Sequence, residues 1–491
     1  MPLPAVPFAA VPFAAALVVG PLTGQLPQFV LDTPPAILAQ QFDNVSCVDV
    51  DGDADLDLFA YSSFGLGGGS IRLLRNDGGN VFTDVSASLP MLGNGATGVS
   101  WFDADGDGDL DAFLTVVSAP SIVLRNVGGG AFVIGAQLAG ASGQTGSAVA
   151  DFDGDGDLDV AVSGSALISS RDRVLLNDGT GQFPTEVFLG VPLSSTVVAG
   201  DLDLDGDADL VYIDAGAGLR VLRNDGANVF TDVSATQAVM LPGSVPSTGV
   251  GLDLEGDGDL DLVLRGGYQG SDTFVRNVGG VLTEIGPLPG PSNSSYLAVG
   301  DVDGDGAPDV VRALLPSGIA LSRNDGVGGF VDGAARMPPQ VIYSWAVALG
   351  DLDGDGDEDL VSCLSGAATL VLRNRDVDLQ VDAAAIGQPW TCRLRSRPGY
   401  ATGAQPMRLA VSLARLPQAV TLPAIGQLWL DLTAPHALFD QVAPPVDGTA
   451  VFSLSIPNDP ALVGVTLHVQ GLVARAPGPP RLTAWLPVTI Q

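Results

Sequence analysis

A nine-residue acidic segment, Asp151–Asp159 (DFDGDGDLD), constrains the fold of this chain more than any other feature. Aspartate stands at positions 1, 3, 5, 7 and 9 of the segment, and glycine at positions 4 and 6. Carboxylates this close together repel one another unless a hard cation lies between them, and Ca²⁺ takes about six to eight oxygen ligands. Glycine accepts the positive φ angles that a tight turn around an ion requires. The segment therefore predicts a Ca²⁺-binding loop.

Seven such segments recur along the chain, at intervals of 54, 48, 50, 52, 48 and 50 residues. A repeat of this length is typical of solenoids, propellers and other arrays. We refer to the segments as loops one to seven and number the positions in each loop from 1 to 9. The loops begin at Asp49, Asp103, Asp151, Asp201, Asp253, Asp301 and Asp351.

We expect positions 1, 3, 5 and 9 of each loop to supply side-chain oxygens, and position 7 to supply a backbone carbonyl oxygen. The chain would then bind up to seven Ca²⁺, one in each repeat. The candidate metal-binding residues are Asp49, Asp51, Asp53, Asp55 and Asp57; Asp103, Asp105, Asp107, Asp109 and Asp111; Asp151, Asp153, Asp155, Asp157 and Asp159; Asp201, Asp203, Asp205, Asp207 and Asp209; Asp253, Glu255, Asp257, Asp259 and Asp261; Asp301, Asp303, Asp305, Ala307 and Asp309; and Asp351, Asp353, Asp355, Asp357 and Asp359.

The loops are not equivalent in sequence. Loop one has Ala54 at position 6, where every other loop has glycine, and loop four has Leu204 at position 4. Loop five carries the longer Glu255 at position 3, and loop six loses one charge at Ala307. We expect loops two, three and seven to bind Ca²⁺ most tightly and loop one most weakly.

Most of the net charge of −35 comes from the loops, which hold 35 of the 56 acidic residues. The 21 acids elsewhere are balanced by 21 basic residues, all of them arginine. A charge run is often a solvated tail, but these acids are periodic and flanked by apolar segments. The chain has no basic patch to neutralise phosphates, so we expect no nucleic-acid partner.

Each loop lies between two short apolar segments that are typical of β-strands. Val99–Phe102 leads into loop two, for example, and Leu110–Val117 leaves it. A fourth strand carries an aromatic residue and an acid, as in Phe82-Thr83-Asp84. Four strands in each period make one blade of a β-propeller, and blades must stack to bury their faces.

An asparagine marks the end of the third strand in every repeat, and arginine precedes it except at Leu176. Asparagine before glycine is typical of hairpin turns, and we expect that role here. The arginine either meets a carbonyl or carboxylate oxygen or is solvated. The asparagines are Asn76, Asn126, Asn177, Asn224, Asn277, Asn324 and Asn374.

The ends of the repeat array predict how the ring closes. The seventh repeat lacks an obvious fourth strand after Asn374, whereas Gln28–Asp32 resembles the fourth strand at Asn80–Asp84. We therefore predict that Phe29–Asp32 is the outer strand of the last blade and pairs with residues near 370. An unpaired strand would leave an exposed edge, which folded proteins avoid.

Three segments of different composition follow from these patterns. Residues 1–24 are apolar and small, as in a secretory signal peptide, although the usual basic residues are missing and a disordered arm is the alternative. Residues 25–377 contain the repeats, and residues 378–491 are Pro-rich with about seven short apolar runs, among them Leu482–Ile490. We expect an all-β protein: a seven-bladed propeller followed by a small β-sandwich.

The three cysteines do not form a disulfide framework. Cys47 and Cys363 lie in the first and last repeats, where a ring would make them neighbours, so they form either a disulfide or buried free thiols. The disulfide state of Cys392 is likewise open. No apolar stretch beyond residue 24 reaches the about 20 uncharged residues that a transmembrane helix needs.

The acidic loops and strand order resemble the FG-GAP/VCBS family, bacterial relatives of the integrin α-subunit propeller, over roughly residues 28–377. The resemblance implies a seven-bladed propeller with Ca²⁺ loops between the first and second strands of its blades. It also implies that partners bind on the face opposite the loops. EF-hands are set aside because they need flanking helices and a glutamate at position 12, where Val162 stands in repeat three.

Function is less constrained by the sequence than fold. No nucleophile–histidine set, zinc motif or phosphate loop is present, so we expect a non-catalytic, monomeric, secreted or cell-surface scaffold for binding or adhesion. Its partner would be an extracellular protein or a glycan. The alternative is a carbohydrate-binding or polysaccharide-degrading protein that uses the propeller as a substrate platform. Tyr268 is the one aromatic residue that we place in a variable loop, which weighs against a lectin.

Overall fold

The computed structural model describes residues 29–31 and 42–491, apart from short internal segments. Those longer than five residues are 63–70, 165–170, 238–245, 397–404 and 474–480. The expected signal segment, Asp32 and Tyr268 lie outside the described residues. No helix in the described part is long and apolar enough to cross a membrane.

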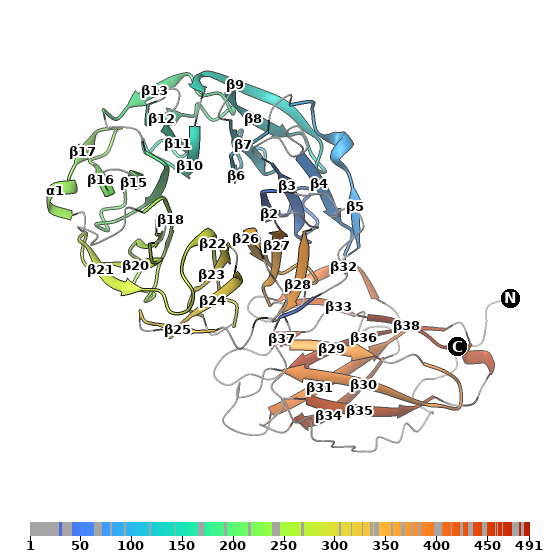
Figure 1. Cartoon of the computed structure of the whole chain (residues 1–491). Coiled ribbons are helices and arrows are strands. Elements are labelled where there is room, and N and C mark those ends of the chain that lie inside the picture. The colour runs from blue at the N-terminus through green and yellow to red at the C-terminus, as the bar shows by residue number, and fades with distance from the viewer. Residues whose placement is uncertain are drawn as a thin grey trace.

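Seven four-stranded antiparallel sheets form a ring, seen nearly face-on in Figure 1. Chain order gives the strand order in six of them. The first three blades are β2 (Asn44–Val48), β3 (Asp57–Tyr61), β4 (Ile71–Asn76) and β5 (Phe82–Asp84); β6 (Gly98–Phe102), β7 (Asp111–Thr115), β8 (Pro120–Asn126) and β9 (Phe132–Ser142); and β10 (Gln144–Ala150), β11 (Asp159–Gly164), β12 (Arg173–Leu176) and β13 (Thr185–Phe188).

The remaining blades repeat the pattern, and the expected first strands are confirmed within one to four residues at their ends. Blades four to six are β14 (Thr196–Gly200), β15 (Asp209–Asp214), β16 (Gly218–Asn224) and β17 (Phe230–Asp232); β18 (Thr248–Leu252), β19 (Asp261–Arg265), β20 (Thr273–Asn277) and β21 (Leu282–Pro287); and β22 (Ser294–Gly300), β23 (Asp309–Leu314), β24 (Gly318–Asn324) and β25 (Phe330–Asp332). Blade seven contains β26 (Ser344–Gly350), β27 (Asp359–Leu364) and β28 (Leu370–Asn374).

The N-terminal strand β1 (Phe29–Leu31) completes blade seven, as predicted. It pairs antiparallel with β28, with Phe29 opposite Asn374 and Leu31 opposite Leu372. Phe29 is fully buried in a core shared by blades six and seven. The two ends of the repeat array are therefore held in one sheet.

The hydrophobic cores lie between neighbouring blades rather than within one blade. Every residue of second strands such as β3, β7 and β11 is buried. One core joins Val45 and Leu58 of blade one to Ala346 and Val361 of blade seven. Since each sheet buries its faces against the next, no blade is stable by itself.

The described C-terminal residues form a three-stranded and a five-stranded sheet with one core between them, and a separate pair of strands, β32 and β33. One sheet has the order β29-β30-β35, and the other β34-β31-β36-β37, with β38 also paired to β36. Trp390 and Phe452 of the first sheet share a core with Leu409 and Val469 of the second, as in a β-sandwich. The strands are β29 (Val377–Val381), β30 (Pro389–Ser396), β31 (Gln405–Ser412), β32 (Arg415–Leu422), β33 (Gly426–Leu430), β34 (His436–Ala443), β35 (Thr449–Ser455), β36 (Thr466–Val473), β37 (Arg481–Leu482) and β38 (Leu486–Thr489).

Two sequence expectations are refined here. The apolar run Leu482–Ile490 forms two short strands, β37 and β38, instead of one. Cys47, Cys363 and Cys392 carry free thiols, which settles the alternative left open for the first two. The short helices are one turn each: η3 (Ser86–Ser88), α1 (Ser234–Gln237) and η5 (Pro460–Leu462).

Candidate metal centre

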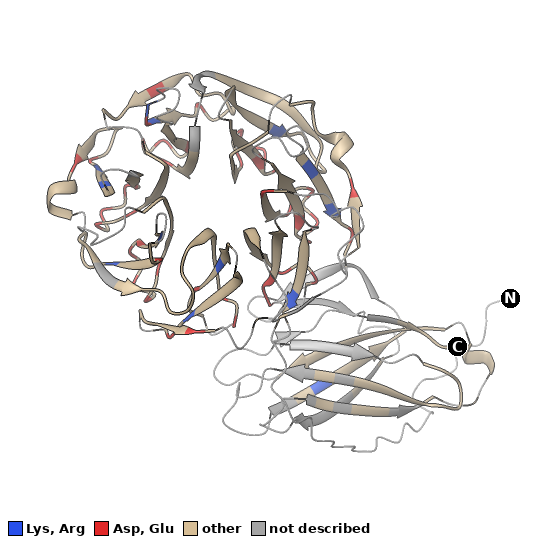
Figure 2. Ribbon diagram, in the orientation of Figure 1, with Lys and Arg blue, Asp and Glu red and all other residues tan. Residues whose placement is uncertain are grey.

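Each acidic loop joins the first strand of a blade to the second, so all seven loops lie on one face of the ring. Acidic residues, red on the ribbon of Figure 2, accordingly occur in the turns of the blades. The position-1 carboxylate caps its own loop. Asp103, for example, accepts backbone N–H bonds from Gly106 at 2.8 Å and from Gly108 at 2.9 Å. The glycines thus fold the backbone around the first carboxylate.

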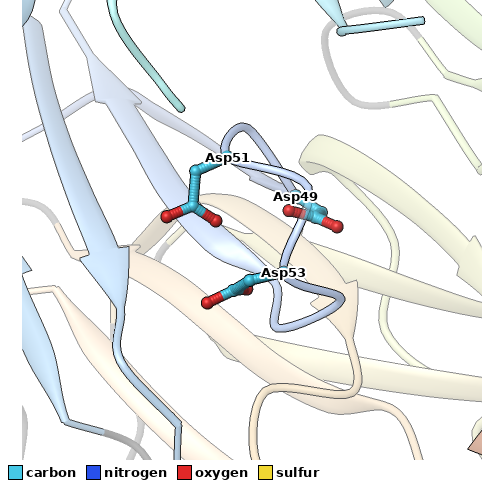
Figure 3. Close-up of side chains that lie close together, drawn as sticks. All are labelled: Asp49, Asp51 and Asp53. Atoms are coloured by element: carbon cyan, nitrogen blue, oxygen red, sulfur yellow. The ribbon is translucent and has the colours of Figure 1, made fainter. Parts of the chain in front are cut away.

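Carboxylate oxygens from three positions converge within 4.8 Å of one another in several loops. Figure 3 shows the three side chains of loop one, which come from one turn and face a common centre. The converging positions are 1, 3 and 9 in loops two, three, four and six, and 1, 3 and 5 in loop one. The groups are Asp103, Asp105 and Asp111; Asp151, Asp153 and Asp159; Asp201, Asp203 and Asp209; Asp301, Asp303 and Asp309; and Asp49, Asp51 and Asp53.

One oxygen of the position-3 carboxylate is buried without a hydrogen-bond partner in several loops. This is the Oδ1 atom of Asp51, Asp105 and Asp203. A buried anionic oxygen is costly unless a donor or a cation satisfies it. A cation bound in the loop would satisfy these oxygens. An oxygen-only donor set of this kind fits Ca²⁺.

The arginine at the end of the third strand contacts the position-3 carboxylate of its own blade. Arg125 lies 3.0 Å from Asp105, and Arg373 lies 3.0 Å from Asp353. The sequence left open whether the arginine meets a carbonyl oxygen, a carboxylate oxygen or solvent. In these blades it meets the carboxylate. In blades one and four the arginine bonds instead to an exposed aspartate, Asp77 or Asp225, and in blade three Leu176 takes its place.

The position-9 aspartate is fully buried or nearly so in every loop and ties the loop to the third strand. In loop two, Asp111 accepts the N–H of Ala104 at 3.0 Å and that of Asn126 at 2.7 Å. The bond from the asparagine N–H recurs in all seven blades, at 2.6–2.8 Å. Each oxygen keeps a second lone pair for an ion.

The recurring asparagine does more than form a turn. Its side-chain N–H donates to the position-2 carbonyl in the loop of the preceding blade, at 2.7–2.9 Å in all seven blades. Its oxygen accepts a backbone N–H from the turn, as from Gly128 to Asn126 at 3.1 Å. The asparagine thus has the expected turn role. It also forms a bond between blades, and the recurring Arg-Asn pair gave no indication of the partner in that bond.

Burial controls the electrostatics of position 9. It raises the pKa of the carboxyl, and the two backbone N–H bonds oppose that shift. The raised pKa is about 7 for Asp57 and about 6 for Asp111, Asp159 and Asp209. A carboxyl in this state gains from a nearby cation, because the cation favours its charged form.

The other predicted ligands are placed less centrally. The position-5 side chains Asp107, Asp155, Asp205 and Asp257 are exposed, as is Asp53, which nevertheless converges with Asp49 and Asp51 in loop one. Asp305 and Asp355 lie outside the described residues. The position-7 side chains Asp55, Asp259 and Asp357 are buried. Ala54 has a φ of 76° and Leu204 a φ of 59°, so both loops hold a non-glycine residue in a left-handed conformation.

The fold and the loops define a class: a seven-bladed β-propeller with a cluster of carboxylates at the first inter-strand turn of its blades. The chain contains an FG-GAP repeat β-propeller. The sequence model of the FG-GAP-like repeat matches residues 41–114, 201–264, 253–312 and 301–362. These matches include loops one, two and four to seven.

Comparison with curated proteins gives no match. Among solved structures, the chain is similar to one in the crystal structure of BBS1N in complex with ARL6DN, soaked with mercury. The identity is 11% and the TM-score 0.47, over 70% of this chain and 96% of that chain.

Proposed function

We propose that this chain is a non-catalytic extracellular binding scaffold whose acidic loops hold Ca²⁺ and thereby stiffen the propeller. The observation that carries the proposal is the convergence of three carboxylates per loop, with buried position-3 oxygens that have no hydrogen-bond partner in Asp51, Asp105 and Asp203. A cation held there binds only the folded chain, so it stabilises that state by mass action.

The proposed setting outside the cell follows from the kind of site. Extracellular Ca²⁺ modules work with a Kd of about 10⁻⁴–10⁻³ M, where the ion is plentiful. A chain with 35 acids in its loops requires such a concentration of cations to relieve their repulsion. Secretion or surface display, a monomeric state and a binding or adhesion role belong to this proposal.

Calorimetric titration with Ca²⁺ tests the ion sites through a matched pair of variants in loop two. Asp105→Asn removes a position-3 ligand, whereas Asp109→Asn alters position 7, which supplies only its backbone carbonyl. We expect the first variant to bind one ion fewer than the parent and the second to bind the same number. Equal stoichiometry in all three proteins, or no binding by the parent, would overturn the proposal.

A second candidate function, binding of a carbohydrate, is favoured by three aromatic side chains at the starts of first strands. These starts lie on the face opposite the acidic loops. Tyr343 is 48% exposed, Trp345 42% and Tyr296 37%, and the Tyr296 hydroxyl is hydrogen-bonded to Tyr61. The Ser295 hydroxyl donates to the carbonyl of Trp345 at 2.8 Å, which holds the two strands side by side.

A glycan array with the parent chain and a Trp345→Ala variant tests this candidate. Stacking on the indole predicts binding by the parent that the variant loses. Exposed Phe188, on blade three, provides a matched control as Phe188→Ala, which should bind as the parent does. Absence of any hit, beside capture of an envelope protein by the same chain, would favour a protein partner.

A further inference from the structure

The candidate ion sites lie at the joints between blades. The asparagine of each blade bonds to the loop before it, and the glycine turn that follows packs on the same loop. A Cβ atom on Gly280 of blade five would come within 3.1 Å of the Asp203 Cβ in loop four. A cavity at the joint between blades two and three is lined by Asp111, Arg125 and Gly181. One side of each loop is therefore covered by the next blade.

The hydrogen bonds at these joints form a continuous chain. In blade two, Asp111 accepts the N–H of Ala104, and the carbonyl of Ala104 accepts the side chain of Asn177 in blade three at 2.8 Å. The backbone N–H of Asn177 in turn donates to Asp159, the position-9 residue of loop three, at 2.8 Å. In loops one to five and seven, position 2 and the asparagine thus connect one position-9 carboxylate to the next.

We infer that the asparagine of each blade is a positioning residue for the ion loop of the preceding blade, so that each joint couples two neighbouring ion sites. The inference rests on the proposed binding of Ca²⁺ by the loops. The position-2 residue lies between the ligands at positions 1 and 3. In loop two its N–H donates to Asp111, and its carbonyl accepts the side chain of Asn177. Loss of the bond from the next blade lets that segment move, so the carboxylates beside it are less preorganised for an ion.

The sequence offers a local reporter for one site. Trp101 is the next-to-last residue of β6 and lies two residues before Asp103, the first ligand of loop two. Tb³⁺ binds oxygen-rich Ca²⁺ sites, and its emission is excited through a nearby indole. Trp345 lies at the start of its strand, six residues from Asp351, and is therefore farther from an ion. Because Trp101 also packs on the core beside loop one, emission that disappears in both Trp101→Phe and Asp105→Asn identifies the signal of loop two.

The test compares Asn177→Ala with Asn224→Ala in the full chain. Asn177 donates to Ala104 in loop two, whereas Asn224 makes the same bond one blade farther on, to Phe152 in loop three at 2.9 Å. Loss of one net hydrogen bond predicts that Asn177→Ala raises the Tb³⁺ midpoint at loop two by about two- to tenfold. Asn224→Ala should leave that midpoint within about twofold of the parent.

Two results would overturn the inference: an unchanged midpoint in Asn177→Ala, or equal shifts in both variants. Circular dichroism at saturating Ca²⁺ verifies that each variant is folded. If Asn177→Ala does not fold, Asn177→Ser retains a turn-forming side chain that cannot reach Ala104, and the same shift is expected. A parent chain without Trp101-dependent emission would count against Ca²⁺ binding itself, which distinguishes failure of the proposed function from failure of the coupling.

Discussion

Asn76 in the first blade donates its side-chain N–H to the carbonyl of Leu352 in the seventh, at 2.8 Å and 276 positions away in sequence. The same bond joins each of the other six blades to the blade before it. The bond from Asn76 to Leu352 therefore closes the ring. It lies at the same joint as the core that contains Leu58 and Val361. The joint between the two ends of the repeat array is thus built like the other six.

Substitution of Asn76 by alanine is expected to destabilise the folded chain by about 1–3 kcal/mol, because the Leu352 carbonyl then loses a buried donor. Chemical denaturation measures the free energy of unfolding. Val81→Ala, in the exposed part of the same turn, is the matched control and should change that free energy by less than about 0.5 kcal/mol. Equal effects of the two substitutions would show that the bond across the joint is energetically unimportant.

Removal of the Phe29 side chain should cost about 3–5 kcal/mol, because this ring is fully buried although it lies in the short N-terminal strand. Val331 occupies the fourth strand of blade six and is 41% exposed, so Val331→Ala serves as the comparison. Equilibrium unfolding of both variants checks this. A Phe29→Ala chain as stable as the Val331→Ala chain would mean that the N-terminal strand does not close the ring in solution.

Replacement of Ala54 by glycine should stabilise loop one by up to about 1 kcal/mol and tighten its ion site. The φ of 76° is strained for alanine and free for glycine. Ala208, at position 8 of loop four, has no positive φ, so Ala208→Gly should not stabilise the chain. Melting temperatures with and without Ca²⁺ measure both effects. A lower melting temperature for Ala54→Gly in Ca²⁺ would contradict the strain at this position.

The pH dependence of stability should reverse when Ca²⁺ is added. Burial raises the pKa of Asp57 to about 7 and that of Asp111 to about 6, above the usual value near 3.8. The calcium-free folded chain therefore binds more protons than the unfolded chain between about pH 4 and 7, and its stability falls as pH rises through this range. Ca²⁺ favours the charged carboxylates, so added ion should stabilise more at pH 7.5 than at pH 5.

Melting curves at these two pH values, in calcium-depleted buffer and in excess Ca²⁺, check this expectation. Without the ion we expect the higher melting temperature at pH 5. A stabilisation by Ca²⁺ that is as large at pH 5 as at pH 7.5 would show that the position-9 carboxylates do not compete between proton and ion.

The sequence predicted those features that have a local signature. The spacing of the acidic loops predicted the blades, and the likeness of Phe29–Asp32 to Phe82–Asp84 predicted the closing strand, of which Asp32 lies outside the described residues. Both follow from side-chain patterns of a few residues. Seven repeats of one pattern made the number of blades countable before any coordinates were known.

Contacts to backbone atoms of distant residues left no such signature. The acceptor of Asn126 is the carbonyl of Val50, a group that every residue possesses, so only the ring geometry identifies it. The exposure of Trp345 and Tyr296 depends on where the first strands begin relative to the face opposite the loops, which a strand pattern does not show. The run at Leu482–Ile490 predicts one strand, because periodicity does not show where β36 stops pairing with β37 and starts pairing with β38.

Thermal unfolding of the intact chain at neutral pH, in millimolar Ca²⁺ and in excess chelator, tests most directly whether the loops are ion cages that hold the ring together. At a Ca²⁺ concentration of ten times Kd, each bound ion adds about 1.4 kcal/mol to the stability of the folded state. Removal of several bound ions should therefore lower the melting temperature by more than about 5 °C. Superimposable melting curves in Ca²⁺ and in chelator would contradict the ion-cage proposal.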